Sequence, residues 1–147
     1  MTWQIKSANK EDLPRLEAFL TEAGVSAEGL NEAIENFSLM ENMEGELKAC
    51  LGVEPVERAG LLRSFVVSPQ IAQPDLMLLF KRAFLTAKKQ ELEALYLVTN
   101  KMSAVSFFGS IGFEMVNKSD LPEALLEKNH LKQVLTVDNS AIMKIIL

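Results

Sequence analysis

Cysteine, histidine, proline and glycine are all scarce in this sequence of 147 residues. The one cysteine, Cys50, excludes a scaffold of intrachain disulfides and favours a reducing compartment, the cytoplasm. One cysteine and one histidine, His130, also disfavour a zinc site built from these ligands. With 5 prolines, 7 glycines and no low-complexity tract, no segment is typical of a disordered linker.

Basic clusters and long apolar runs are missing as well. The net charge is −5, and Lys and Arg form no block, which argues against nucleic acid or an anionic membrane as the main partner. No segment is long enough to span a bilayer, and "MTWQIKSANKEDL" has charges where a signal peptide needs an apolar run. A small anionic ligand, which needs only one local site, stays compatible with this composition.

Apolar residues make up 48% of the chain, enough for the core of one domain over residues 1–147. Their alternation predicts a hairpin at residues 37–56 and strands at 2–8, 60–68, 92–99, 113–116 and 140–147. Their helical spacing predicts helices at residues 10–24, 26–37, 75–90, 103–112 and 121–131. The strand–helix–strand order from residue 60 to 99 predicts a right-handed crossover between parallel strands. We therefore expect an α/β fold with a mixed sheet.

Several finer features follow from local residue chemistry. Ser26 is a candidate N-cap of the second helix. Strand 60–68 is nearly continuous in apolar residues, as a buried central strand would be. The closing strand, "SAIMKIIL", is expected to be a sheet edge that pairs with a second copy in a homodimer. Trp3 and the seven Met residues are interpreted as core filling.

The order of the elements, with "GLLRSFVVSP", a long helix, "LYLVT" and "FFGSIGF", resembles the GNAT superfamily of acyl-CoA-dependent N-acyltransferases. The words "ENF", "LGVEP", "GLLRS" and "LPEAL" resemble its arsenic-resistance N-acetyltransferase branch. The resemblance covers nearly the whole chain. It implies a mixed central sheet with helices on both faces, and transfer of an acetyl group from acetyl-CoA to the amine of a small, amino-acid-like molecule.

The same resemblance implies where the acetyl-CoA donor binds. Its pantetheine arm enters where the central strand, residues 62–67, splays from residues 95–99, and its pyrophosphate lies on the turn before the long helix. The implied contacts are Phe65, Val66, Val67, Gln73, Asp75, Leu76, Met77, Asn100 and Phe107.

The pyrophosphate turn departs from the family pattern of Arg or Gln, two variable residues, Gly, one variable residue, then Gly or Ala. Ala72, Asp75 and Met77 occupy the three specified positions, and Pro74 between them has no N–H to give. Asp75 is expected to act as a helix cap that fills the anion site and repels phosphate. The alternative function is therefore an inactive GNAT-fold binding or regulatory protein, unless Lys81, Lys101 or Lys118 holds the pyrophosphate.

The acid–base residues are candidates from the same resemblance. Phe108 takes the position of the Tyr that acts as general acid in many members of the family, and it is assigned to substrate binding. Glu54 is the candidate general base or, alternatively, a solvated carboxylate. Arg63 and Ser64 lie in the central strand, Ser64 as a second candidate catalytic residue and Arg63 as a candidate for substrate binding. An Arg inside an apolar strand needs a partner, so Arg63 either holds a substrate carboxylate or forms a structural salt bridge with an acidic neighbour. Tyr96 is interpreted as core or sheet edge.

Overall fold

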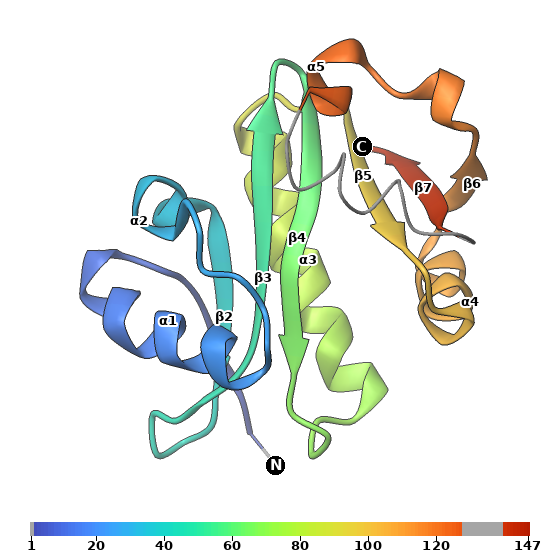
Figure 1. Cartoon of the computed structure of the whole chain (residues 1–147). Coiled ribbons are helices and arrows are strands. Elements are labelled where there is room, and N and C mark those ends of the chain that lie inside the picture. Colours follow the sequence, from blue (N-terminus) through green and yellow to red (C-terminus); the bar gives the residue numbers. More distant parts are fainter. Residues whose placement is uncertain (1, 128–139) are drawn as a thin grey trace. The chain divides into compact units, whose positions relative to one another are not determined.

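The computed structural model describes residues 2–127 and 140–147. Within these ranges, seven strands form one mixed sheet in the hydrogen-bonded order β1-β2-β3-β4-β5-β7-β6 (Figure 1). The chain divides into two compact units, the first made of Met1–Glu54 and Leu62–Gln90, the second of Pro55–Leu61 and Glu91–Leu147. Strands β3 (Leu47–Val56) and β4 (Ala59–Val67) contribute residues to both units.

In the first unit, an antiparallel meander follows the expected hairpin. Strand β1 (Gln4–Ser7) pairs with β2 (Phe37–Glu41), and β2 pairs with β3. The turn between β2 and β3 is held by the Asn42 side chain, whose oxygen accepts from two backbone N–H groups. Gly45 completes this turn with a φ of +81°, a conformation that glycine adopts at little cost.

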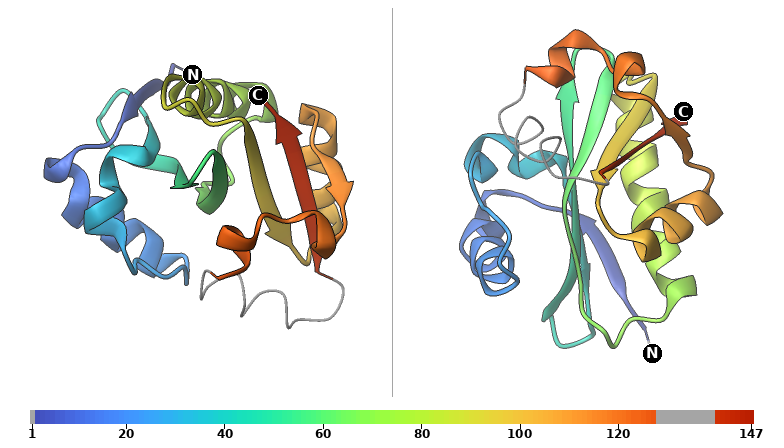
Figure 2. Two further views of the ribbon diagram at one scale, coloured as in Figure 1. Left: turned by 90° about the horizontal axis from the view of Figure 1, so that it is seen from above. Right: turned by 45° about the vertical axis from the view of Figure 1, so that its right-hand side comes forward.

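Helices cover both faces of the strands of the first unit, as Figure 2 shows. Helix α1 (Leu13–Glu22) follows the 3-10 turn η1 (Lys10–Asp12), and α2 (Leu30–Ala33) runs into the 3-10 turn η2 (Ile34–Asn36). Helix α3 (Gln73–Lys89) lies on the opposite face. The core beneath α1 and α2 consists of Leu16, Leu20, Leu30, Ile34, Phe37, Leu39 and Cys50.

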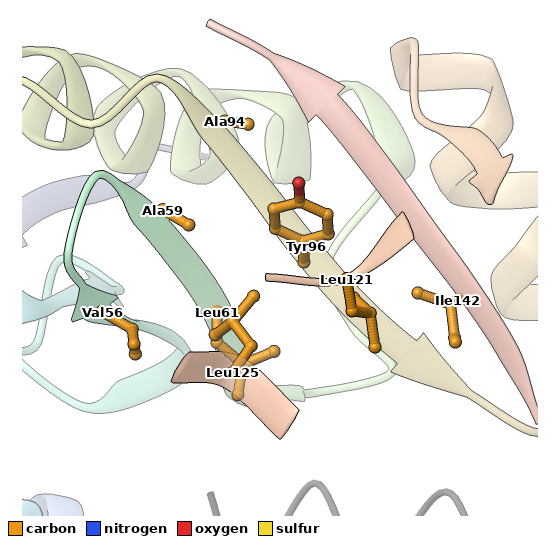
Figure 3. Packing of buried hydrophobic residues seen from close by; sticks show 8 residues of the cluster. All are labelled: Val56, Ala59, Leu61, Ala94, Tyr96, Leu121, Leu125 and Ile142. Carbon is orange, nitrogen blue, oxygen red and sulfur yellow. The ribbon is translucent and has the colours of Figure 1, made fainter. Parts of the chain in front are cut away.

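The second unit is built around β5 (Ala94–Thr99) and β7 (Ala141–Ile146), which pair antiparallel along their whole length. The start of β4, Ala59–Leu61, pairs parallel with β5, as the crossover predicts, and β6 (Glu114–Val116) pairs with β7. Helix α4 (Met102–Ile111), the 3-10 turn η3 (Lys118–Asp120) and helix α5 (Glu123–Leu126) complete the unit. Its core holds Val56, Ala59, Leu61, Ala94, Tyr96, Leu121, Leu125 and Ile142 (Figure 3).

The mixed α/β fold and its element order are confirmed, while several finer expectations are wrong. Strand β7 lies between β5 and β6. The expectation that it is a sheet edge, available to pair with a second copy in a homodimer, is therefore wrong. Strand β4 is buried only as far as Leu62 and is partly exposed from Arg63 onward. Ser26 caps no helix, because its hydroxyl accepts from the Glu28 N–H and α2 begins after Gly29.

Some expectations concern residues at the surface or beyond the described ranges. Met43, Met102 and Met115 are exposed rather than core residues, with exposed fractions of 66%, 77% and 58%. Of the described part of the helix expected at residues 121–131, Glu123–Leu126 are helical, and the expected positions 128–131, with His130, lie outside the described residues. The expectation of one domain over residues 1–147 stays a prediction. No described helix is both long and apolar enough to cross a membrane.

Candidate functional site

Arg63 and Glu54 come together in the first unit, where β3 nears its end and β4 passes beside it. The Arg63 Nη1 atom lies 3.3 Å from Glu54 Oε2, and the two side chains are 19% and 20% exposed. Both therefore keep access to solvent while they pair. Arg63 was expected either to form a salt bridge with an acidic neighbour or to hold a substrate carboxylate. The structure shows the salt bridge, and the partial exposure of the Arg63 side chain leaves it within reach of a ligand.

A second contact ties Arg63 to the loop between α1 and α2. Its Nη2 atom donates to the carbonyl oxygen of Glu28 at 3.2 Å. Gly29 follows with a φ of +76°, which turns the chain into α2. Arg63 and Ser64 line a hollow below this loop that has no space large enough for a water molecule. A substrate at this point would therefore lie at the rim of the hollow unless the loop moves.

Ser64 has an unusual backbone for a residue within a strand. Its φ is +55°, in the left-handed region that residues other than glycine adopt at a cost in free energy. Its carbonyl oxygen accepts from the Sγ atom of Cys50 at 3.2 Å. Burial raises the pKa of Cys50 to about 12, although a backbone hydrogen bond from Val66 partly opposes this rise. Cys50 is thus a protonated thiol of β3 in the core beneath α1 and α2, and not a nucleophile.

The turn before α3 differs from the expected capped arrangement. The N-cap residue is Ala72, so Asp75 is the third residue of the helix, and the prediction that Asp75 caps it is wrong. The Asp75 N–H and the Leu76 N–H both donate to the Ala72 carbonyl, at 3.0 and 3.1 Å. Pro74 has no N–H. Three of the first four helical residues therefore have no free N–H for a phosphate.

The Asp75 carboxylate instead binds Trp3, the residue just before β1. Its Oδ2 atom accepts from the indole Nε1 of Trp3 at 3.2 Å, and both residues are partly buried. Trp3 is therefore a hydrogen-bond donor to the turn as well as a packing residue. Sequence analysis missed this pair because 72 positions separate its members.

The other candidate donor contacts of the first unit differ in exposure. Phe65, Val66 and Val67 are partly exposed along β4, and the Phe65 ring contacts the Phe80 ring edge-on at 5.2 Å. In α3, Gln73 is exposed, Met77 is partly exposed and Leu76 is buried. A buried Leu76 side chain can contribute to a ligand site only through its backbone.

The remaining candidates lie in the second unit. Asn100 is exposed just after β5, and Phe107 is partly exposed on α4. Phe108 is buried, and its ring contacts the rings of Phe107 and Phe113 with centroids 5.3 and 5.5 Å apart. Phe108 is thus part of the core of this unit. The role of these three residues at a ligand stays a prediction.

The chain is similar over its whole length to solved acetyltransferases. N-acetylglutamate synthase from Neisseria gonorrhoeae, complexed with coenzyme A and N-acetyl-glutamate, gives a TM-score of 0.77 and 23% identity over 100% of this chain, which spans 35% of that enzyme. Rv2747 from Mycobacterium tuberculosis, in complex with CoA and NLQ, gives 0.78 and 16% over 98% of this chain and 99% of its own. A GNAT-family acetyltransferase from Staphylococcus aureus Mu50 gives 0.75 and 21% over 99% of both chains. This protein therefore has the fold of the GNAT acetyltransferases.

A closer relationship in sequence is to YwlB, an uncharacterized protein of Bacillus subtilis strain 168. The two are 32% identical over 145 residues, which cover 98% of this chain and 97% of YwlB. The chain belongs to the same family as YwlB. No family model matches the sequence. The resemblance to the arsenic-resistance branch stays a prediction.

Proposed function

We propose that this protein is an N-acetyltransferase that transfers the acetyl group of acetyl-CoA to the amine of a small, amino-acid-like molecule. The observation that carries the proposal is the partly exposed Arg63 guanidinium beside Glu54, on the central strand of a GNAT fold. The complexes of two proteins of this fold with coenzyme A support the choice of donor, and N-acetyl-glutamate in one of them supports an amino-acid acceptor.

Arg63 would hold the carboxylate of the acceptor. Its contacts to Glu54 and to the Glu28 carbonyl, at 3.3 and 3.2 Å, are long for hydrogen bonds of a charged group. A ligand carboxylate offers the planar guanidinium two parallel bonds and can replace these contacts. Glu54 would then lie beside the ammonium group, where it can accept the proton that the amine must lose before it attacks. Ser64, next to Arg63, stays a candidate catalytic residue.

The first unit suits the pantetheine arm of acetyl-CoA better than it suits the pyrophosphate. When bound, acetyl-CoA would supply the acyl group as a thioester. The partly exposed backbone of Phe65–Val67 suits the pantetheine arm, whereas the turn at Ala72–Asp75 does not suit the pyrophosphate. This turn is the specific observation that favours the alternative, a GNAT-fold binding or regulatory protein without acetyl transfer.

Steady-state kinetics test the acceptor proposal. The assay follows release of the coenzyme A thiol with a panel of amino acids and with the amines that lack their carboxylates. Arg63→Met should raise KM for the amino acids about 100-fold and leave the amines unaffected, because only the carboxylate contact is lost. Glu54→Gln should lower kcat about 100-fold. Arg82→Met, which removes an exposed Arg of α3, is the matched control. Equal losses for amino acids and amines in Arg63→Met would contradict the proposal.

Thermal unfolding with excess acetyl-CoA separates the proposal from its alternative. Asp75→Asn removes the charge but keeps an oxygen for the Trp3 indole, so acetyl-CoA should bind about tenfold more tightly and raise the melting temperature further. Trp3→Phe breaks the same hydrogen bond and keeps the charge, so it should give no gain. If acetyl-CoA stabilises neither the wild type nor Asp75→Asn, the alternative holds.

A further inference from the structure

The second unit contains a pocket of about 310 Å³ that the proposed acetyl transfer does not use. Its volume is at the lower end of the range for small-molecule sites. Apolar side chains form much of its wall, and four charged ones lie around it. The lining residues are Val56, Glu57, Arg58, Ala59, Glu93, Ala94, Tyr96, Pro122, Lys144 and Ile146.

Tyr96 brings a buried hydroxyl group to this pocket. The residue is 4% exposed, and its hydroxyl makes no hydrogen bond within residues 2–127 and 140–147. Figure 3 shows the hydroxyl at the end of the ring that points away from Leu121 and Leu125. A buried hydroxyl without a partner costs roughly 1–3 kcal/mol. The pocket is thus the place where a partner for this hydroxyl can bind.

Lys144 adds a positive charge beside the same ring. Its Nζ atom lies 5.5 Å from the centroid of the Tyr96 ring, and the two residues are opposite each other on β7 and β5. Glu114 is opposite Lys144 on β6 and also contributes to the charge of this face. In the described part of the chain, Lys144 forms no ion pair within 4.0 Å, so its ammonium group keeps donors for a ligand.

The other charges around the pocket limit the kind of ligand. Arg58 and Glu93 pair with each other at 3.1 Å, and both are mostly exposed at the rim. Glu57 is also exposed. Among the residues that the structure describes near Tyr96, the ligand therefore meets one cation without an ion pair and one hydroxyl. Val56, Ala59, Ala94, Pro122 and Ile146 offer it an apolar surface.

We propose that this pocket binds a small organic carboxylate with a compact apolar body. The carboxylate accepts hydrogen bonds from the Tyr96 hydroxyl and the Lys144 ammonium group, and the body of the ligand packs against the apolar wall. This arrangement gives the buried hydroxyl its partner and the cation its counter-charge. All residues that line this site belong to the second unit, whereas Arg63 and Glu54 belong to the first.

Titration of the isotope-labelled full chain by NMR tests the pocket with three probes of nearly the same shape. Phenylacetate carries the carboxylate, phenylacetamide is neutral, and phenethylamine carries the opposite charge. We expect phenylacetate to bind most tightly and to shift the amide signals of the lining residues. Tyr96→Phe and Lys144→Met should each weaken phenylacetate about tenfold, since each removes one hydrogen bond to a charged group.

Lys89→Met is the matched control, because it removes an exposed Lys of α3 that does not line the pocket. It should bind phenylacetate as the wild type does. The melting temperature of each unliganded variant shows that it is folded. The proposal is overturned if no probe binds at about 10 mM. It is equally overturned if phenylacetate binds no better than phenylacetamide, or if the two pocket variants bind it as tightly as the control.

Discussion

Arg15 and Arg63 both lie against carboxylates in the first unit, but their surroundings differ. Arg15 donates from Nη2 to Asp12 Oδ1 at 2.8 Å and from Nη1 to the Gly45 carbonyl at 3.0 Å, and it also forms an ion pair with Glu41. The side chains of Asp12 and Glu41 are only 7% and 10% exposed. Lys6 adds a second cation at 3.2 Å from Asp12. The contacts of this cluster are short and its two carboxylates are buried, although the Arg15 and Lys6 side chains are 33% and 37% exposed.

Arg63 has fewer and longer contacts. Its two donors reach Glu54 and the Glu28 carbonyl at 3.3 and 3.2 Å, and about a fifth of each side chain of the pair is exposed. A carboxylate as buried as Asp12 or Glu41 is costly to leave without its cation, whereas an ion pair whose carboxylate also faces solvent contributes less to stability. The comparison therefore separates a structural cluster around Arg15 from a pair at Arg63 that a ligand can replace.

The acidity of Asp12 agrees with its structural role. Burial alone would raise the pKa of this carboxyl, but the Asn9 N–H and the cations of Lys6 and Arg15 outweigh burial and lower it. The Asn9 and Asp12 side chains also cap the 3-10 turn η1 reciprocally. The pattern Asn-x-x-Asp was present in the sequence as a signal of this turn, although its ion pairs were not.

Arg15→Met should give the largest loss of stability. The change leaves two buried carboxylates, Asp12 and Glu41, with Lys6 as the remaining cation, at a cost of about 3 kcal/mol. For a chain of this size the melting temperature should fall by roughly 6–12 °C. Thermal unfolding measures this, with Arg82→Met as a control that should change little. A loss below about 1 kcal/mol would remove the distinction between the two arginines.

Asp12→Asn should cost about 2 kcal/mol at neutral pH, and this cost should depend on pH. The pKa of Asp12 is lowered in the folded state, so its charge stabilises the protein above the unfolded pKa, near 3.8. This contribution is lost as the pH falls through the folded pKa. The stabilities of wild type and variant, measured by urea unfolding, should therefore converge toward about pH 3 and below. A difference that stays constant with pH would assign the effect to the η1 cap alone.

The sequence predicts the elements of this fold well because strands and helices leave local periodic patterns. The hairpin at residues 37–56 and the crossover from β4 to β5 were both found in this way. The place of β7 in the sheet was not predicted. It depends on long-range pairing with β5 and β6, which leaves no local pattern in the sequence. The role of Asp75 was not predicted either, because its carboxylate accepts a hydrogen bond from the distant Trp3 indole instead of capping the helix.

The candidate site was predictable in part. The need of Arg63 for a partner follows from its place in an apolar strand, and the partner could have been found from the turn at Glu57 and Arg58. Counting outward from that turn in a hairpin places Glu54 diagonally across from Arg63. The Glu28 carbonyl could not be found, because it comes from a loop packed on the strand. The pocket at Tyr96 could not be found either, since β5 and β7 must first be paired.

The smallest effect on stability is expected at Arg63. Arg63→Met should cost less than about 1 kcal/mol, because the Glu54 side chain is 20% exposed and keeps its contact with solvent when the guanidinium is removed. A double-mutant cycle with Glu54→Gln, measured by urea unfolding, should give a coupling energy of about 0.5 kcal/mol. The same cycle for Arg15 and Asp12 should give a clearly larger value. Coupling above about 2 kcal/mol between Arg63 and Glu54 would make them a structural pair. A weak coupling is what allows an acceptor carboxylate to take the place of Glu54 on the guanidinium at little cost.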